Sequence, residues 1–592
     1  MTEPRFSISL PHNLSAGESL HKLKPVAGPF SVTATYACLD EIVEEQEGRC
    51  KNDYGYYRFV DNPLLCRIQE GLQAHYQIRH CLAYTSLKTA ALELLDYLLL
   101  SKAKMTLKVV SDWGEHEPFS IVSSLSELNT SLSMAPPSDL SVLSPFSEGK
   151  DELLVINVQQ PLQFIRTQEK FLEQVKSHRI PIIVVSDRFP EKLWPARLIH
   201  YWVLPLNSTQ HSVVGGAILS NMDRQMDELQ GLRMQRGPIL SSRNAAYFLG
   251  EIDEGKASYQ EKLIQRLCQL EQARYGFLFP SGMQAITTLL MLVRRPGKAQ
   301  IIAVGHLYTD TYALLTYAKQ RTGRIENIFI GVDEMERLPG VVNEQTAAII
   351  TESITNPLND VPDLEAITRL AQKHKIPVIV DNTFATPHNC KPLNLGVDYV
   401  LHSTTKFFNG KNDHGGGIIL LNNAGAAAKI KKYQDHWGNE LSPLESAILW
   451  ERLQDFEERM ARFQTNALQV AEFLQQHPGI EKLYFHSFPS HRSYQVSQRI
   501  INGAGSVMSF TLTRPGMAGL RQFYDAPLQH ILKAPSLGSN QTILCPYTLL
   551  AHYHESDEVL EELGLSRYLI RLSVGCEENI ERVIDSLDQA LR

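Results

Sequence analysis

The chain contains a degenerate internal repeat, which constrains its fold more than any other feature of the sequence. Residues 176–184 (KSHRIPIIV) and residues 372–380 (QKHKIPVIV) are identical at five of nine positions, at a shift of 196. Each segment has the pattern of a helix end followed by a short buried strand, because its last residues are apolar and β-branched. Because such self-similarity marks a duplicated structural unit, we expect two related α/β units in the chain.

The similarity extends to both sides at a shift of 195. Residues 82–95 (LAYTSLKTAALELL) align with residues 277–290 (FLFPSGMQAITTLL), and residues 207–211 (NSTQH) align with residues 402–406 (HSTTK). Two generic βα units can resemble each other by coincidence, but coincidence does not explain why all the segments keep their order and spacing. The sequence therefore predicts a duplicated domain of roughly 190 residues.

This repeat divides the chain into five predicted parts. They are an N-terminal extension (1–30), a first copy (31–222), a polar connecting helix (223–242), a second copy (243–450) and a C-terminal domain (451–592). Strands that alternate with helices predict an α/β architecture with a largely parallel sheet. The last part has a long helical pattern, strand-like runs and a closing helix, so we expect a small α+β domain there.

Charge and cysteine spacing narrow the classes of function. The 592 residues carry 57 Lys and Arg against 65 Asp and Glu, a net charge of −8, and no basic run stands out, which disfavours nucleic acid as a partner. The eight cysteines lack CxxC spacing, so no metal site is indicated. Neither a secretory signal nor a membrane span is apparent in the sequence. We therefore expect a cytoplasmic enzyme or binding protein that acts on a small molecule.

Three features of the second copy indicate its chemistry. Lys406 follows the strand-like segment VDYVLHS, Asp381 ends the buried segment VIVD, and Ser281-Gly282 begins a helix. Alone, such a lysine is more often a surface charge, and such a serine is more often only a helix cap. Together, a helix start for a phosphate, a buried carboxylate and a lysine on one α/β scaffold indicate pyridoxal phosphate.

Residues 243–592 also resemble the Cys/Met-metabolism family of pyridoxal-phosphate enzymes. The motifs that carry the resemblance are PSGMQA, HLYTDTYALL, ESITNPL, VIVDNTFATP, HSTTKFFNG, APSLGS and RLSVGCE, in the order of the family. The resemblance implies a large domain of fold type I, which is aspartate aminotransferase-like, followed by a small C-terminal domain. It also implies pyridoxal 5'-phosphate as the cofactor.

The family's functional residues can be carried over position by position. Lys406 resembles the Schiff-base lysine that shuttles protons, Asp381 the partner of the pyridine nitrogen, and Tyr308 the tyrosine that stacks on the cofactor ring. Arg571 resembles the arginine that binds the substrate α-carboxylate, and Ser536 a serine near the substrate and the lysine. The resemblance implies seven further cofactor contacts: Ser281, Gly282, Met283, Asn356, Thr383, Ser403 and Thr405.

Three departures from the family pattern concern the distal end of the substrate. Gly410-Lys411 stands where the family usually has Gly-His or Gly-Gln, Gln541 where a Glu related to specificity is common, and Asp310 where Gly or Cys is common. These changes leave the cofactor chemistry intact. They leave open whether the enzyme replaces or eliminates a group on its substrate.

The first copy has lost the residues that this chemistry needs. By the alignment, His211 corresponds to Lys406 and Val185 corresponds to Asp381. Histidine cannot form a Schiff base, and valine cannot hold a protonated pyridine nitrogen. We therefore predict that the first copy is a degenerate, non-catalytic domain.

The first copy nevertheless retains a motif that the second copy lacks. Its segment YGYYRFVDNP resembles a family segment that reaches across a dimer interface to the cofactor phosphate, with Tyr56 and Arg58 at the key positions. The aligned stretch of the second copy carries Glu251 and Asp253, which would repel a phosphate. The resemblance thus implies that Tyr56 and Arg58 complete the phosphate site of the second copy.

The leading expectation from the sequence is γ-replacement on an O-acylated homoserine by a thiol such as cysteine, as in cystathionine γ-synthases. The alternative is a C–S lyase that eliminates thiol from cystathionine or methionine. A catalytically inactive scaffold is a third hypothesis, because half of the chain has lost its catalytic residues. The family resemblance further implies a homodimer or homotetramer.

Overall fold

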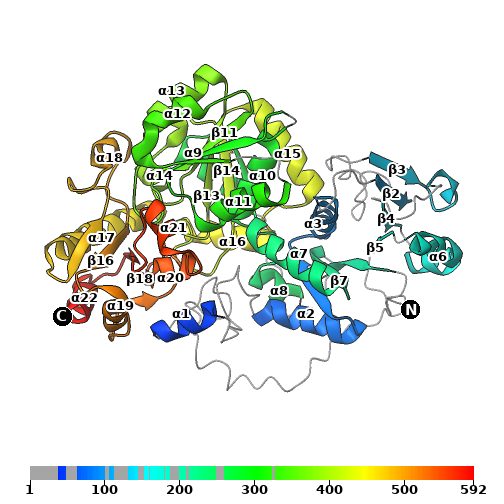
Figure 1. The fold of residues 1–592 in the computed structure, drawn as a ribbon, viewed down its shortest axis with the longest axis horizontal. Helices are drawn as coiled ribbons and strands as arrows, with labels where there is room; N and C mark the ends of the chain where they lie inside the picture. Colours follow the sequence, from blue (N-terminus) through cyan, green and yellow to red (C-terminus); the bar gives the residue numbers. More distant parts are fainter. Residues whose placement is uncertain are drawn as a thin grey trace. The chain divides into compact units, whose positions relative to one another are not determined.

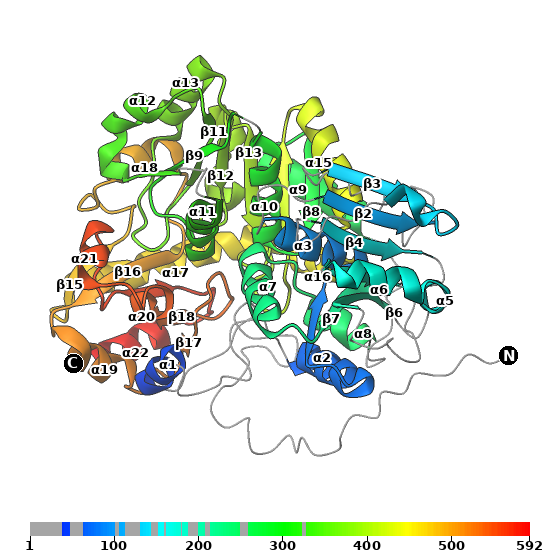
Figure 2. The ribbon, with the colours of Figure 1, turned by 45° about the vertical axis from the view of Figure 1, so that its right-hand side comes forward.

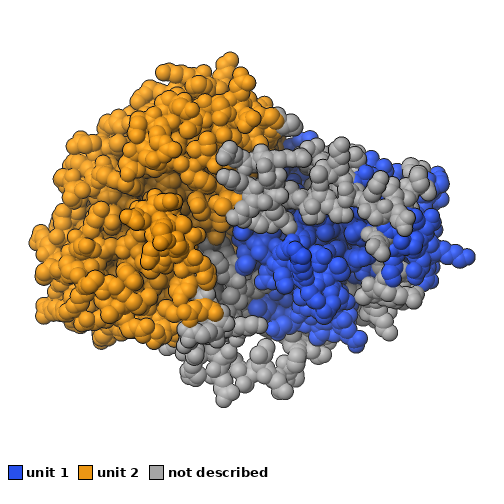
Figure 3. Space-filling model, in the orientation of Figure 1, with its two compact units in different colours: residues 1–15, 62–255, 431–442 blue, residues 16–61, 256–430, 443–592 orange. Residues whose placement is uncertain are grey.

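The computed structural model describes the chain in twelve segments, which are residues 38–47, 63–100, 106–112, 131–143, 152–158, 161–178, 180–186, 199–207, 213–248, 259–295, 297–322 and 327–592. They form two compact units (Figure 3). Unit 1 holds the described parts of 62–255 together with 431–442, and unit 2 holds the described parts of 16–61, 256–430 and 443–592. Among the described helices, none is long and apolar enough to cross a membrane.

Unit 1 is built on a seven-stranded sheet with the strand order β1-β7-β6-β5-β4-β2-β3. The strands are β1 (His80–Tyr84), β2 (Thr106–Ser111), β3 (Ser131–Ala135), β4 (Glu152–Asn157), β5 (Ile182–Val185), β6 (Tyr201–Asn207) and β7 (Val213–Ser220). Its helices are α2 (Pro63–Tyr76), α3 (Leu87–Leu100), α5 (Pro161–Thr167), α6 (Glu169–Ser177), α7 (Asp223–Arg236) and α8 (Ser242–Phe248).

The large sheet of unit 2 also has seven strands, in the order β8-β14-β13-β12-β11-β9-β10 when it is followed from β8. The strands are β8 (Tyr275–Phe279), β9 (Gln300–Val304), β10 (Ile328–Ile330), β11 (Thr346–Glu352), β12 (Val378–Asp381), β13 (Tyr399–Ser403) and β14 (Gly417–Leu421). Figure 2 shows β9, β11, β12 and β13 side by side. The helices are α9 (Gln260–Glu271), α10 (Gly282–Val293), α11 (Thr309–Thr322), α12 (Leu338–Val341), α13 (Leu364–His374), α14 (Thr386–Asn389) and α16 (Pro443–Arg452). The helix α15 (Ala424–Trp437) begins in unit 2, and its residues from 431 onward belong to unit 1.

The two large sheets have the same topology. In both, the first two strand pairs are antiparallel and the other four are parallel. The register agrees as well, because Tyr84 pairs with Gly216 in unit 1 and Phe279 pairs with Gly417 in unit 2. This agreement matches the alignment of residues 82–95 with 277–290 and confirms the expected α/β architecture with a largely parallel sheet.

The repeated segments form the elements that their patterns predict. Residues 176–184 cover the end of α6 and most of β5, and residues 372–380 cover the end of α13 and most of β12. The strands β5 and β12 are apolar and almost fully buried, as expected for central strands of a parallel sheet. Their carboxyl ends, where ligands bind in such sheets, carry Val185 in unit 1 and Asp381 in unit 2.

The C-terminal part of unit 2, where Figure 1 labels β16 and β18, is built on a five-stranded sheet. Its strand order is β15-β16-β19-β18-β17. The strands are β15 (Ile480–Tyr484), β16 (Val507–Leu512), β17 (Leu532–Lys533), β18 (Ile543–Pro546) and β19 (Ile570–Ser573). The helices are α17 (Phe456–Gln476), α18 (Tyr494–Ile500), α19 (Gly516–Tyr524), α20 (Tyr547–Ala551), α21 (Asp557–Glu562) and α22 (Glu581–Leu591). The long helix, the strands and the closing helix follow the sequence pattern.

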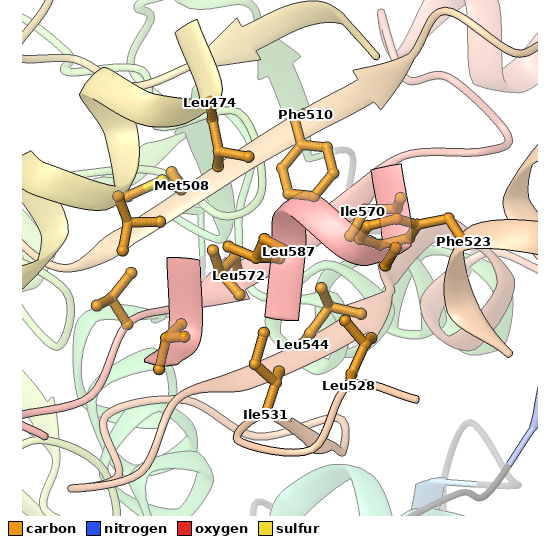
Figure 4. Close-up of a cluster of buried hydrophobic side chains, with 14 of the residues drawn as sticks. Leu474, Met508, Phe510, Phe523, Leu528, Ile531, Leu544, Ile570, Leu572 and Leu587 are labelled. Atoms are coloured by element: carbon orange, nitrogen blue, oxygen red, sulfur yellow. The ribbon is translucent and has the colours of Figure 1, made fainter. Parts of the chain in front are cut away.

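The core of this C-terminal part also contains a helix from near the N-terminus. Figure 4 shows Met508, Phe510, Leu572 and Leu587 packed together in this core. The helix α1 (Leu39–Gln46) contributes Leu39 and Ile42 to the same core. The sequence analysis assigned this stretch to the first copy. The structure instead places α1 in unit 2, because its apolar side chains are buried there.

Candidate active site

Lys406 lies just beyond the end of β13, where the chain leaves the large sheet of unit 2. Its side chain is buried, with 8% exposed, so the segment is not a surface loop. The amine Nζ donates a hydrogen bond to the hydroxyl Oγ of Ser536 at 3.2 Å. Ser536 follows β17 and precedes β18, so the loop between these strands brings it to the lysine.

Asp381 ends β12, the strand beside β13. Its Oδ1 accepts hydrogen bonds from the backbone N–H of Thr383 at 2.9 Å and from the Thr383 hydroxyl at 2.5 Å. Its Oδ2 accepts no hydrogen bond from the residues that the structure describes. Burial raises the pKa of Asp381 above its usual value, and the Thr383 hydrogen bonds oppose that rise. A protonated nitrogen of a cofactor ring, if placed beside Oδ2, would therefore pair with a carboxylate that water solvates poorly.

The start of α10 forms a cradle next to these residues. Ser281 caps the helix, and its Oγ accepts the backbone N–H of Gln284 at 3.1 Å. A Cβ on Gly282 would lie 3.0 Å from the Cβ of Ser403, so only glycine lets the helix approach β13 this closely. The hydroxyl of Thr405 accepts the backbone N–H of Gly416 at 3.2 Å. A helix start surrounded by hydroxyl groups fits a phosphate.

Glu352 links two predicted cofactor residues. It ends β11, lies opposite Asp381 in the β11–β12 pair and is buried. One carboxylate oxygen accepts the backbone N–H of Tyr308, and the other accepts that of Asn356 at 3.2 Å. Burial raises the pKa of Glu352 well above its usual value, and the charge of Asp381 raises it further. Glu352 therefore positions the backbone of Tyr308 and Asn356.

Arg571 lies in β19 and is held by several partners. Its guanidinium donates to Oδ1 of Asn356 at 3.1 Å and to the carbonyl oxygens of Pro535 at 3.1 Å and Ser536 at 3.0 Å. Its Cζ lies 5.2 Å from the ring centre of Tyr547, within cation–π range. Ser536 thus contacts both Arg571 and Lys406, which brings a guanidinium group and an amine to one residue.

The sequence analysis did not identify Tyr547. Its hydroxyl lies 3.3 Å from Nδ2 of Asn356 and 3.3 Å from Oγ1 of Thr309. Burial raises the pKa of Tyr547 to about 12, so it stays protonated. No spacing or motif in the sequence marks this residue, because its contacts join α20 to the start of α11 and to the loop after β11, both distant in sequence.

Asp310 lies in the first turn of α11, next to Thr309. Burial raises the pKa of Asp310 to about 7, and the positive charge of Lys406 opposes that rise. This electrostatic interaction places a titratable carboxyl in the neighbourhood of the lysine. The departure that the sequence analysis noted at this position therefore lies at the site.

Most of the predicted site residues therefore belong to one unit. Unit 2 contains Lys406, Asp381, Tyr308, Ser281, Gly282, Met283, Asn356, Thr383, Ser403, Thr405, Ser536 and Arg571. Five other residues that the sequence analysis singled out lie outside the described residues: Tyr56, Arg58, His211, Glu251 and Asp253.

Unit 1 has a different arrangement at the start of α3, which aligns with the start of α10. Ser86 accepts the backbone N–H of Thr89 at 3.0 Å, as a helix cap does. The hydroxyl of Thr89 donates to the carbonyl oxygen of Trp437 at 2.8 Å, and Gly438 packs against Ser86. Protein atoms of the segment 431–442 therefore occupy the region that would correspond to a phosphate cradle.

The fold and the site define an α/β enzyme of the pyridoxal-phosphate class. The Cys/Met metabolism PLP-dependent enzyme family matches residues 256–592, more than half of the chain. The chain belongs to this family, and pyridoxal 5'-phosphate is its cofactor.

Related proteins and structures agree with this assignment. An L-methionine gamma-lyase from Fusobacterium nucleatum is 33% identical over 333 residues, which are 56% of this chain and 82% of that protein. A cystathionine gamma-lyase from Bacillus subtilis is 32% identical and covers 55% of this chain and 83% of that protein. The structure of cystathionine gamma synthase from Xanthomonas oryzae in complex with cystathionine has a TM-score of 0.53 and 29% identity, and covers 56% and 84%. The structure of cystathionine gamma-lyase from Lactobacillus plantarum with L-serine has a TM-score of 0.52 and 31% identity, and covers 55% and 84%.

Proposed function

We propose that this enzyme is a C–S lyase that acts on a thioether amino acid such as cystathionine or methionine. The observation that carries the proposal is the pair of contacts to Ser536. Arg571 donates to its carbonyl oxygen at 3.0 Å and Lys406 donates to its hydroxyl at 3.2 Å. An α-amino acid needs both groups close together, one for its carboxylate and one for the proton on its Cα.

The bound cofactor supplies an electron sink that stabilises negative charge on the substrate carbon. The roles of the protein side chains follow from their positions. Lys406 Nζ takes the proton from Cα and returns it to a neighbouring carbon or to the leaving sulfur. Asp381 would hold the proton on the pyridine nitrogen of the cofactor, and the N–H groups at the start of α10 would hold its phosphate. Arg571, held by Asn356 and Tyr547, orients the substrate carboxylate.

Asp310 favours elimination from a thioether over reaction of an anionic ester. Above its pKa of about 7, Asp310 places a negative charge near Lys406. That charge would repel the succinyl or phosphate group of an activated homoserine. The distal end of methionine is uncharged and that of cystathionine is a zwitterion without net charge, so neither meets a net repulsion of this kind. The lyase relatives from Fusobacterium nucleatum and Bacillus subtilis also support elimination.

The γ-replacement that the sequence led us to expect is the second candidate. The similarity to the cystathionine gamma synthase structure supports it, because that structure covers the same 56% of the chain. An O-acetyl leaving group, which is neutral, is compatible with Asp310. The two candidates differ in whether a thiol acceptor is required.

A product assay separates these candidates. The lyase should release a keto acid and ammonia from cystathionine or methionine alone. The synthase should form cystathionine only from cysteine with O-acetyl-, O-succinyl- or O-phosphohomoserine. Lys406→Ala serves as the blank for both reactions. If product formed only from the homoserine esters with cysteine, and none from cystathionine or methionine, the lyase proposal would be refuted. If no substrate gave product, both candidates would be refuted.

We further propose that unit 1 is a degenerate copy of the large domain and has no catalytic site of its own. Its shared strand order with unit 2 supports the common origin. Val185 at the end of β5 and the contact between Thr89 and Trp437 support the loss of the cofactor site. Reduction with borohydride and peptide mapping tests this proposal: labelled cofactor should appear on Lys406 and on no residue of unit 1.

A further inference from the structure

Asn412 extends the contact between Lys406 and Ser536 by one hydrogen bond. The Ser536 hydroxyl accepts from Lys406 Nζ at 3.2 Å and donates to the side-chain oxygen Oδ1 of Asn412 at 3.0 Å. The three side chains are buried, with 8%, 1% and 1% exposed for Lys406, Ser536 and Asn412. No motif of the sequence analysis assigned a role to Asn412.

The backbone at Asn412 explains why this residue type stands there. Its φ is +54°, in the left-handed region that asparagine, aspartate and glycine adopt more readily than other residues. The side-chain oxygen of Asn409 accepts the backbone N–H groups of Asn412 at 3.0 Å and Asp413 at 3.2 Å. The turn therefore holds the Asn412 amide in place against Ser536.

We propose that Asn412 is a positioning residue that fixes the direction of the Ser536 hydroxyl toward Lys406. A carbonyl oxygen can only accept, so the single proton of Ser536 must point to Asn412. Toward Lys406 the hydroxyl then presents only a lone pair. This inference rests on the proposed role of Lys406 as the proton-transferring amine.

The direction of this hydrogen bond matters for proton transfer. A neutral amine has one lone pair, and that lone pair must take the substrate proton. If Ser536 could donate to it, the hydroxyl would compete with the substrate. By holding the serine proton, Asn412 prevents this competition and lets Ser536 only accept from the amine.

Two substitutions with matched backbone preferences test the inference. Asn412→Gly removes the acceptor and allows Ser536 to donate to the Lys406 nitrogen, which favours its unprotonated form. Asn412→Asp keeps the acceptor and adds a negative charge, which favours the protonated form. Lys429→Ala, at an exposed position of α15 outside the site, serves as the surface control.

The main readout is the pH titration of the near-visible absorbance of the cofactor-loaded full-length protein, without substrate. Relative to wild type, we expect the midpoint to fall by about half a pH unit in Asn412→Gly and to rise by about one in Asn412→Asp. Lys429→Ala should titrate like wild type. In addition, kcat should fall about tenfold in Asn412→Gly, while KM changes little.

Shifts in opposite directions distinguish this role from a purely structural one. Equal midpoints in wild type and both Asn412 variants, or shifts of both in one direction, would overturn the inference. If Asn412→Gly does not retain cofactor, Asn412→Asp decides alone, and a midpoint no higher than wild type rejects the inference. A wild-type protein without this absorbance would instead refute the proposed function.

Discussion

Replacing Gly417 by alanine should disrupt the cradle at the start of α10, around Ser281 and Gly282. Gly417 begins β14 and crosses the start of α10. A Cβ at this position would lie 2.4 Å from the carbonyl oxygen of Ser281, 2.7 Å from its carbonyl carbon and 2.8 Å from the Cα of Gly282. All three are backbone atoms, so no side-chain rotation can relieve the overlap. Either β14 or the start of α10 must move.

The size of the effect follows from these distances. Carbon atoms in contact lie about 3.5–4.0 Å apart, so the overlap is on the order of 1 Å. Overpacking of this kind costs roughly 1–3 kcal/mol. At roughly 2–4 °C per kcal/mol for a large domain, the melting temperature of unit 2 should fall by about 2–12 °C. The displaced helix start should also weaken cofactor binding by about tenfold or more.

Gly415 provides a matched control within the same run of glycines. A Cβ there would meet only the carbonyl oxygen of Pro280, at 3.9 Å, which is an ordinary contact. Thermal unfolding and cofactor titration should therefore separate Gly417→Ala from Gly415→Ala, with the latter close to wild type. Equal melting temperatures and equal cofactor affinities for the two variants would refute the proposed close approach of β14 to α10.

Three further predictions follow from the site. Lys406→Ala should lose the borohydride-sensitive absorbance and essentially all turnover, and normal turnover would reject Lys406 as the reactive amine. Arg571→Lys should raise KM for the amino acid and leave the cofactor spectrum unchanged, because lysine keeps the charge but loses the planar, two-pronged guanidinium group. An unchanged KM would mean that Arg571 has only a structural role. Burial raises the pKa of Asp310 from 3.8 to about 7, so its contribution to folding is fully present below pH 3.8 and is lost as the pH rises through 7. The free energy of unfolding that Asp310→Asn gains over wild type should therefore grow between these pH values, by up to about 4 kcal/mol. Melting temperatures of both proteins at pH 4.5 and 8.5 measure this gain. A difference in melting temperature that is the same at both pH values would contradict the prediction.

Local sequence patterns predicted the secondary structure well where one force dominates. The apolar, β-branched run at 376–380 strongly favours a buried strand, and β12 covers most of it. The periodic polar and apolar residues at 456–476 form the long helix α17. By contrast, residues 39–46 have an amphipathic pattern that predicts a helix but not its partner. Only the folded chain shows that Leu39 and Ile42 enter the C-terminal core.

The candidate site divides in the same way. Lys406 and Asp381 were identified from their places next to strand ends, and Arg571 was identified from its resemblance to a family motif. Glu352 and Tyr547 acquire their roles through hydrogen bonds to residues that are distant in sequence. Tyr547 lies 191 positions from Asn356, and no periodic signal spans such a distance.

The sequence by itself determined the repeated α/β pattern and the family, and it predicted the reactive lysine, since these depend on the order and type of neighbouring residues. Only the tertiary structure decided which groups adjust that chemistry. The direction of the hydrogen bond from Ser536 to Asn412 and the raised pKa values of Glu352 and Asp310 depend on burial and on distances between loops. Burial and distance are properties of the packed chain, because packing removes water and brings residues from separate strands within hydrogen-bonding range.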